Sequence, residues 1–197
     1  MCRFISVRVG SRWVTGALLL ALFTGLNAAV FRDAPQAPDF TLTRADMGEY
    51  RLHSRKGRVV VLYFGFTHCP HVCPQTMASL SMLVARLTPE ERSRTDVVFI
   101  SVDPARDTPE RVRAFLSRFA GEYIGLIPDE DQLNRLRTTY NLVARKVQEP
   151  GQQSYDFVHT DLVYAVGLAG RLRHAFFADT SVDSMLKDVQ ALLREAP

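Results

Sequence analysis

Cys69 and Cys73 are the residues whose type and spacing point most directly to chemistry. Three residues separate them, so across one helical turn both sulfurs lie on the same side, with α-carbons roughly 6 Å apart. A disulfide fits near the long end of its range, and a metal ion with metal–sulfur bonds of about 2.3 Å bridges the gap without strain. The pair is therefore a candidate structural disulfide, redox dithiol or metal site.

The cysteines follow a buried strand, in the stretch YFGFTHCPHVCPQTM. The carboxyl end of a strand in an open α/β sheet is the usual place for ligands, and a helix N-terminus stabilises a thiolate. With an imidazole from one of the chain's histidines, the two thiolates would form a ligand set that suits Cu(I) and also holds Cu(II). Structural zinc prefers a fourth protein ligand, which His68 or His71 could supply. An exposed loop site that exchanges its metal favours copper over zinc.

The elements that must position these side chains follow from hydrophobic periodicity and helix caps. Strands are expected at 39–42, 50–52, 59–66, 97–102, 123–127, 162–168 and 172–177. Helices are expected at 74–87, from a cap at Asp107 or Thr108 to 119, at 129–140, and from a cap at Thr180 or Ser181 to 193. Alternating strands and helices, a terminal hairpin and a last helix predict an α/β, thioredoxin-like fold with a mixed central sheet flanked by helices.

The N-terminal segment predicts a membrane anchor. Residues 1–12 carry three arginines and no acid, and residues 13–31 contain no charge. About 19 apolar residues match a bilayer-spanning helix, and basic flanks stay in the cytoplasm. We expect a cytoplasmic segment at 1–12, a transmembrane anchor or uncleaved signal at 13–31, a linker at 32–38 and a copper-binding domain at 39–197. A cleaved signal peptide is the alternative, but cleavage after Ala28 would place Leu26 at −3 and cleavage after Ala29 would place Asn27 there, and neither residue is small.

This topology places the domain in the periplasm or another extracytoplasmic space, attached to a bacterial-type inner membrane by a single span. The chain has 197 residues, and 47% of them are hydrophobic, which is ordinary for one globular domain plus a short extra segment. The net charge is only +3, with scattered basic residues and no interleaved aromatic platform. These features argue against a nucleic-acid partner.

Two motifs resemble the Sco/SenC family. The stretch GFTHCPHVCP is similar to the family's G-[YF]-T-[HN]-C-P-D-[VI]-C-P, and SVDPARDTPE at 101–110 is similar to S-V-D-P-x-R-D-T-P-E. The resemblance covers about residues 35–195, and His159 falls where that family has its copper-ligand histidine. It implies copper ligation by Cys69, Cys73 and His159.

The same resemblance implies a role in the maturation of the copper A site of cytochrome c oxidase. Members of the family deliver copper to that site or keep its thiols reduced. The implied partners are the copper A subunit and a thiol reductant or copper donor. The chain departs from the family pattern at His71, where Asp is usual, and at Thr160–Asp161, where Ser and a small residue are common.

Two other functions compete with the copper carrier. A metal-free thiol–disulfide oxidoreductase would use Cys69 and Cys73 as a redox dithiol, although the stretch 155–162 lacks the proline that thioredoxins pack against theirs. A peroxiredoxin-like peroxidase shares the opening APDFTL at 37–42, but Phe66 stands where such enzymes need Thr or Ser. Asp103 and Asp107 are expected to shape the loop beside the site, with Asp107 a helix cap rather than a catalyst.

Overall fold

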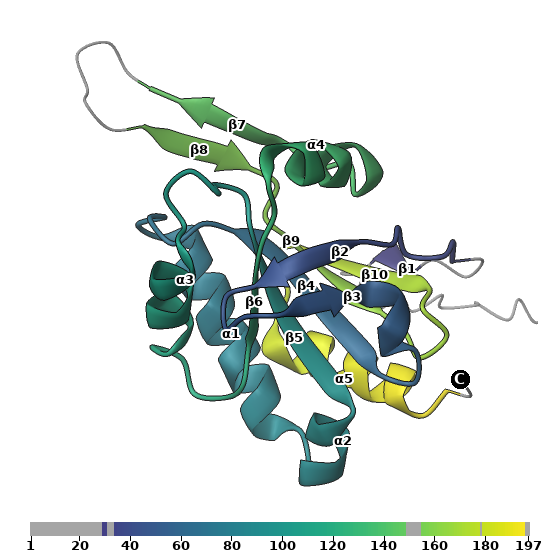
Figure 1. Cartoon of the computed structure of the whole chain (residues 1–197). Coiled ribbons are helices and arrows are strands. Elements are labelled where there is room, and N and C mark those ends of the chain that lie inside the picture. Colours follow the sequence, from purple (N-terminus) through teal and green to yellow (C-terminus); the bar gives the residue numbers. More distant parts are fainter. Residues whose placement is uncertain (1–28, 31–33, 149–154, 178, 196–197) are drawn as a thin grey trace, which may run out of the picture.

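A mixed sheet forms the centre of the protein in the computed structural model, which describes residues 29–30, 34–148, 155–177 and 179–195 (Figure 1). Its eight described strands lie in the order β1-β10-β9-β4-β5-β6-β2-β3. They are β1 (Ala29–Val30), β2 (Thr41–Arg44), β3 (Glu49–Arg51), β4 (Val59–Gly65), β5 (Thr95–Ser101), β6 (Ile124–Ile127), β9 (Leu162–Val166) and β10 (Leu172–Phe177). Strands β4, β5 and β6 are parallel, whereas β9 runs antiparallel to β4 and β2 antiparallel to β6.

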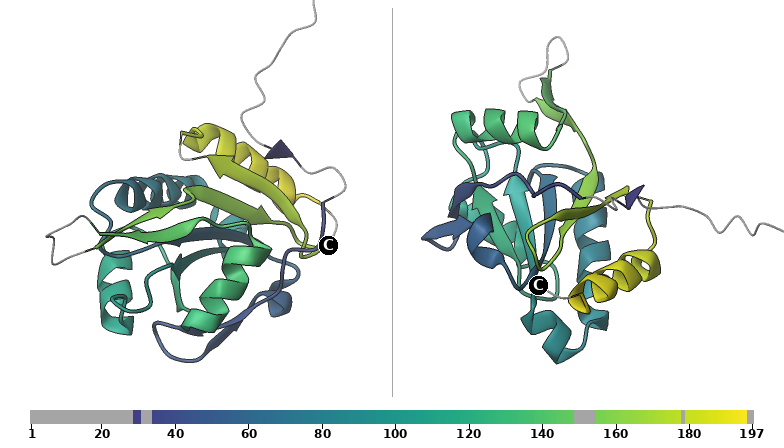
Figure 2. Two further views of the ribbon diagram at one scale, coloured as in Figure 1. Left: turned by 90° about the horizontal axis from the view of Figure 1, so that it is seen from above. Right: turned by 90° about the vertical axis from the view of Figure 1, so that its right-hand side faces the viewer.

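Helices cover both faces of this sheet (Figures 1 and 2). α1 (Val72–Arg86), α3 (Pro109–Leu116) and α5 (Val182–Leu193) lie on one face, and α4 (Glu130–Thr139) lies on the other. The short α2 (Pro89–Ser93) links α1 to β5, and the 3-10 helix η1 (Leu52–Arg55) links β3 to β4. The predicted α/β fold with a mixed, helix-flanked sheet is confirmed.

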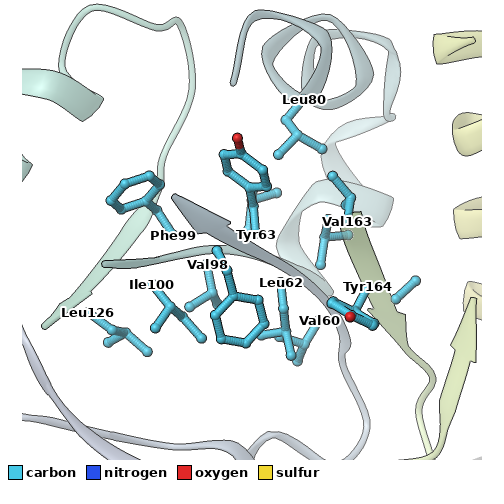
Figure 3. Close-up of a cluster of buried hydrophobic side chains, with 14 of the residues drawn as sticks. Val60, Leu62, Tyr63, Leu80, Val98, Phe99, Ile100, Leu126, Val163 and Tyr164 are labelled. Carbon is cyan, nitrogen blue, oxygen red and sulfur yellow. The ribbon is translucent and has the colours of Figure 1, made fainter. Parts of the chain in front are cut away.

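The core lies on both faces of β4 and β5, whose residues alternate between them (Figure 3). Tyr63 and Phe99 point toward Leu80 of α1, and the even-numbered neighbours such as Leu62 and Ile100 point to the opposite layer. All five side chains are fully buried. Burial of one such aliphatic or aromatic side chain stabilises the fold by about 1.5–3 kcal/mol, so the strand that leads to the cysteines is rigidly held.

A second, two-stranded sheet stands beside the central one (Figure 1). β7 (Ala144–Val147) pairs antiparallel with β8 (Asp156–His159), and Ala144 lies opposite His159. β8 ends at His159, and β9 of the central sheet begins three residues later at Leu162. The sequence reading placed His159 between a polar loop and a strand and did not predict this hairpin.

Side-chain N-caps explain where three of the longer helices begin. Thr108, Asp129 and Ser181 accept backbone hydrogen bonds as the N-caps of α3, α4 and α5. α1 begins at Val72, earlier than predicted, so Cys73 lies inside its first turn. α3 ends at Leu116, three residues before the predicted end, and α2 was not predicted.

The N-terminal predictions fall mostly outside the described residues. The structure does not describe residues 1–28 and 31–33. Ala29–Val30 forms β1 and pairs with β10 rather than continuing a helix. Within the described part of the chain, no helix combines the length and apolar character that a bilayer crossing requires.

Candidate metal centre

Cys69, Cys73 and His159 come together at one end of the central sheet. One potential ligand atom from each lies within 4.8 Å of the other two. The Sγ of Cys73 is 3.5 Å from Nε2 of His159, although 86 residues separate them in the chain. The structure therefore brings together all three residues that the sequence nominated as ligands.

The two cysteines are placed by the junction of β4 and α1. β4 ends at Gly65, and a β-carbon at this position would lie only 3.1 Å from Sγ of Cys73 and 3.0 Å from the ring of Phe99. Glycine thus leaves the space that the Cys73 sulfur occupies. Cys73 is fully buried, whereas Cys69 is half-buried. The site is therefore open to solvent on the Cys69 side.

Neither of these cysteines forms a disulfide, and their surroundings move their pKa values in opposite directions. The neighbouring Cys73 thiol hydrogen-bonds to the Cys69 sulfur and lowers the pKa of Cys69 to about 5, with help from backbone N–H groups of residues 71–73. One of these, the N–H of Cys73, lies 3.4 Å from that sulfur. The same contact with Cys69, together with burial, raises the pKa of Cys73. These contacts therefore favour the thiolate at Cys69 and the thiol at Cys73.

His159 presents Nε2 to the sulfurs because its other nitrogen is occupied. Nδ1 lies 3.1 Å from the carbonyl oxygen of Thr160. A carbonyl only accepts, so Nδ1 carries the proton and Nε2 keeps the free electron pair that a metal requires. The edge-on contact with the Phe66 ring, at 5.6 Å between centroids, fixes the plane of the imidazole.

The remaining candidate ligands lie elsewhere. His71 is the exposed N-cap residue of α1 and is absent from the group of converging ligand atoms. His68 instead faces Asp107, with Nδ1 and Oδ1 3.7 Å apart, and its Nε2 lies 3.4 Å from the Arg111 guanidinium. Neither histidine supplies the fourth position that structural zinc prefers, so the arrangement suits a three-coordinate soft ion.

Asp107 holds the cysteine loop rather than capping a helix. Its buried carboxylate accepts hydrogen bonds from the backbone N–H and the hydroxyl of Thr67, at 3.2 Å and 2.6 Å, and from the Ser101 hydroxyl at 2.6 Å. Thr108 is the cap instead. The expectation that Asp107 shapes the loop beside the site is confirmed, and its expected role as a cap is wrong.

The sequence analysis did not predict the hydrogen-bond partners of Asp103 and Asp161 near the site. Asp103 is buried and accepts hydrogen bonds from Arg106 and from the hydroxyl of Tyr155. On the other side of the cysteines, Asp161 accepts from Thr76 of α1 at 3.4 Å. The departure of Asp161 from the family pattern was the one sequence signal for the second pair, and nothing local marked Tyr155.

Comparison with known proteins agrees with this geometry. The SCO1/SenC family model matches residues 31–194. A protein of Stutzerimonas stutzeri named for copper binding is 30% identical over 173 residues, which cover 88% of this chain and 84% of the relative. Solved structures also match: copper-bound ScoI of Bradyrhizobium japonicum has a TM-score of 0.73 at 30% identity, over 81% of this chain and all of that one. Apo Sco1 of Thermus thermophilus has a TM-score of 0.77 at 32% identity, and the match covers 86% of this chain and 98% of that one.

The fold and the site define a thioredoxin-like domain with two thiols and one imidazole converging at a strand end. The extent of the family match then makes the assignment specific, because it spans nearly all described residues. The chain belongs to the SCO1/SenC family, as the two sequence motifs predicted.

Proposed function

We propose that this protein binds copper through Cys69, Cys73 and His159 and assists maturation of the copper A site of cytochrome c oxidase. The observation that carries the proposal is the convergence of two sulfurs and one imidazole nitrogen within 4.8 Å. Soft thiolates with an imidazole suit Cu(I), and the three-ligand set lacks the fourth protein ligand that structural zinc prefers. Relatives of 30% and 25% identity have been solved with copper bound.

A competition titration tests the ligand set. The full-length chain, with Cys2→Ser throughout to remove the third thiol, is titrated anaerobically with Cu(I) against a chelator and separately with Cu(II). Cys69→Ala and Cys73→Ala should each abolish the sulfur-to-copper charge-transfer band, and His159→Ala should weaken Cu(I) binding. His71→Ala is the matched control and should bind as the parent does. Unchanged affinity in His159→Ala would refute the three-ligand site.

The maturation step is proposed as copper delivery, thiol reduction or both. The low pKa of Cys69, about 5, keeps a nucleophilic thiolate at the accessible side of the site. A thiolate there attacks a partner's disulfide, forming a mixed disulfide that Cys73 resolves, so the partner is reduced and the pair is oxidised. In copper delivery, a sulfur of the partner would replace the same thiolate as a ligand of the copper ion.

Two assays separate these activities. Copper-loaded protein is mixed with the reduced, metal-free copper A domain, and the visible spectrum of the copper A centre reports delivery. Metal-free reduced protein is mixed with the oxidised domain, and thiol counting reports reduction. His159→Ala should impair delivery far more than reduction, because only copper binding uses the imidazole. Equal loss in both assays would contradict this division of roles.

The dithiol chemistry alone remains the second candidate function, supported by the free, half-buried Cys69. The peroxidase alternative gains no support, because Phe66 is buried against His159 and the Thr67 hydroxyl is bound to Asp107. We further propose that the apolar segment before β1 anchors the domain to a membrane and holds it outside the cytoplasm. Accessibility of the domain to protease in intact spheroplasts supports that location, and protection refutes it.

A further inference from the structure

The loop at 101–108 contacts both segments that carry the proposed metal ligands. Toward the cysteines, Asp107 binds Thr67, two residues before Cys69. Toward the histidine, Arg106 and Asp103 bind Tyr155, four residues before His159. One loop of the central domain therefore sets the position of both halves of the site.

Tyr155 contacts neighbouring residues through its hydroxyl, its carbonyl oxygen and its ring. Its hydroxyl donates to Oδ1 of Asp103 at 2.9 Å, and its carbonyl oxygen accepts from Nη1 of Arg106 at 2.8 Å. The guanidinium carbon of Arg106 and Nζ of Lys146 lie 3.7 Å and 3.5 Å from the ring centroid. Arg106 also donates to the second oxygen of Asp103. Such charge-assisted and cation–π contacts are the stronger kinds of polar interaction.

The restraint at Tyr155 reaches His159 through a row of rings. Tyr155, Phe157 and His159 alternate along one extended segment and therefore face the same side. The rings of Tyr155 and Phe157 are 5.8 Å apart, and both Phe157 and His159 lie 5.6 Å from the buried ring of Phe66. Phe66 follows directly after β4, so the row ends on the strand that carries the cysteine loop.

The hairpin needs such a restraint. Among the described strands, β7 and β8 pair only with each other and belong to a separate sheet (Figure 1). An isolated two-stranded hairpin is marginally stable in water, so side-chain contacts must fix its place.

We propose that Tyr155 is a positioning residue that holds His159 at ligand distance from Cys73, through its hydrogen bond to Asp103 and its contacts with Arg106. The inference rests on the proposed function, because it concerns the imidazole as a copper ligand. Partners that orient a metal ligand from outside the coordination shell commonly contribute about 10- to 100-fold to metal affinity.

The test is a double-mutant cycle on the full-length Cys2→Ser chain, with Cu(I) affinity measured by competition. Tyr155→Phe removes the hydroxyl and should weaken Cu(I) binding by about 10-fold, and Tyr155→Leu, which also removes the ring, by up to about 100-fold. In a His159→Ala background both changes should have almost no further effect, because the ligand that they position is gone. The Cu(II) absorption and EPR spectra of Tyr155→Leu should move toward those of His159→Ala.

Tyr50→Phe is the matched control. Tyr50 donates to Asp96, and the Arg55 guanidinium lies over its ring at 5.5 Å, so the same residue types meet at the opposite end of β5. This variant should lower the unfolding free energy and leave Cu(I) affinity unchanged. The inference is overturned if copper affinity is unchanged in both Tyr155 variants. It is also overturned if these variants reduce the affinity equally with and without His159. A parent chain whose affinity does not depend on His159 overturns the proposed function itself.

Discussion

The Cys69 thiol lies at the entrance of α1, where it receives hydrogen bonds from Cys73 and from backbone N–H groups. Since these contacts stabilise the thiolate, Cys69 should be alkylated with a pH midpoint near 5. Cys73, whose pKa is raised, should stay unreactive in the folded protein. Alkylation rates across pH, read by mass spectrometry of the peptide that contains both residues, measure this difference.

Cys73→Ala is the informative variant for this acidity. It removes the thiol that hydrogen-bonds to the Cys69 sulfur, the largest cause of the low pKa, so the midpoint of Cys69 should move upward. Cys73→Ser keeps a hydroxyl donor and should move it less. A midpoint that stays near 5 in Cys73→Ala would assign the acidity to the helix N-terminus alone.

Gly65 is a second residue whose identity the site requires. In Gly65→Ala, the new β-carbon would lie 3.0–3.1 Å from Tyr63, Phe99 and the Cys73 sulfur, which are buried and unable to move apart. Overpacking of this kind costs about 1–3 kcal/mol of unfolding free energy. Copper affinity should also fall, because the Cys73 sulfur is displaced.

Gly167→Ala controls for the glycine substitution itself. The nearest atom to its new β-carbon is Cγ of Arg173, at 3.2 Å, in a long side chain that can shift. Chemical unfolding of both variants, with copper titration in parallel, should show the larger loss of stability and the loss of affinity only in Gly65→Ala. Wild-type copper affinity in Gly65→Ala would show that the sulfur keeps its place.

At the scale of elements, α5 packs over a buried histidine of β10. His174 is 5% exposed, stacks on Phe176 and lies 3.7 Å from the carboxylate of Asp188 in α5. Burial lowers the pKa of His174 from its ordinary 6.5, with Arg173 acting in the same direction and Asp188 and Glu195 opposing it. The unfolded chain therefore binds the proton more readily than the folded one.

The sign of the resulting pH dependence follows. The contribution of His174 to the unfolding free energy should be greatest above pH 6.5. It should fall as the pH drops through that value and level off below the lowered pKa of the folded state. Urea unfolding at several pH values measures the slope. His174→Gln should flatten it, whereas His53→Gln, at an exposed position, should not. Identical slopes in His174→Gln and the parent would assign the acid sensitivity to other groups.

Most of the elements around the site were predictable from sequence. β4 and β5 are continuous β-branched and aromatic runs, and α4 and α5 begin at cap residues that the sequence marked, because these signals are local. α2 also carried a readable signal, since Thr88 and Glu91 form a capping box that the periodicity analysis passed over.

The β7–β8 hairpin was not predictable in the same way. Its first strand reads Ala-Arg-Lys-Val, without the alternation of a half-buried strand. Contacts from far along the chain hold it: the partner of the Tyr155 hydroxyl, Asp103, is 52 residues away. The prediction that His159 lies beside the cysteines came from the family resemblance, because no local sequence pattern indicates a contact between residues 86 positions apart.

For the whole molecule, bound copper would join the hairpin to the central domain. The ion would link Cys73 in α1 to His159 in β8, two segments that the described sheets do not hydrogen-bond to each other. A ligand at 100 times its dissociation constant stabilises the folded state by about 2.7 kcal/mol. For a chain of this size that corresponds to a rise in Tm of about 5–11 °C.

The location of the stabilisation distinguishes this link from general ligand binding. Hydrogen exchange should show copper-dependent protection that extends from the first turn of α1 into β7 and β8, while η1 and β3, far from the site, serve as internal references. His159→Ala should keep part of the rise in Tm through the two sulfurs but lose the protection in the hairpin, because the link to β8 is cut. Protection of the hairpin that persists without the imidazole would show that copper orders β7 and β8 through some other contact.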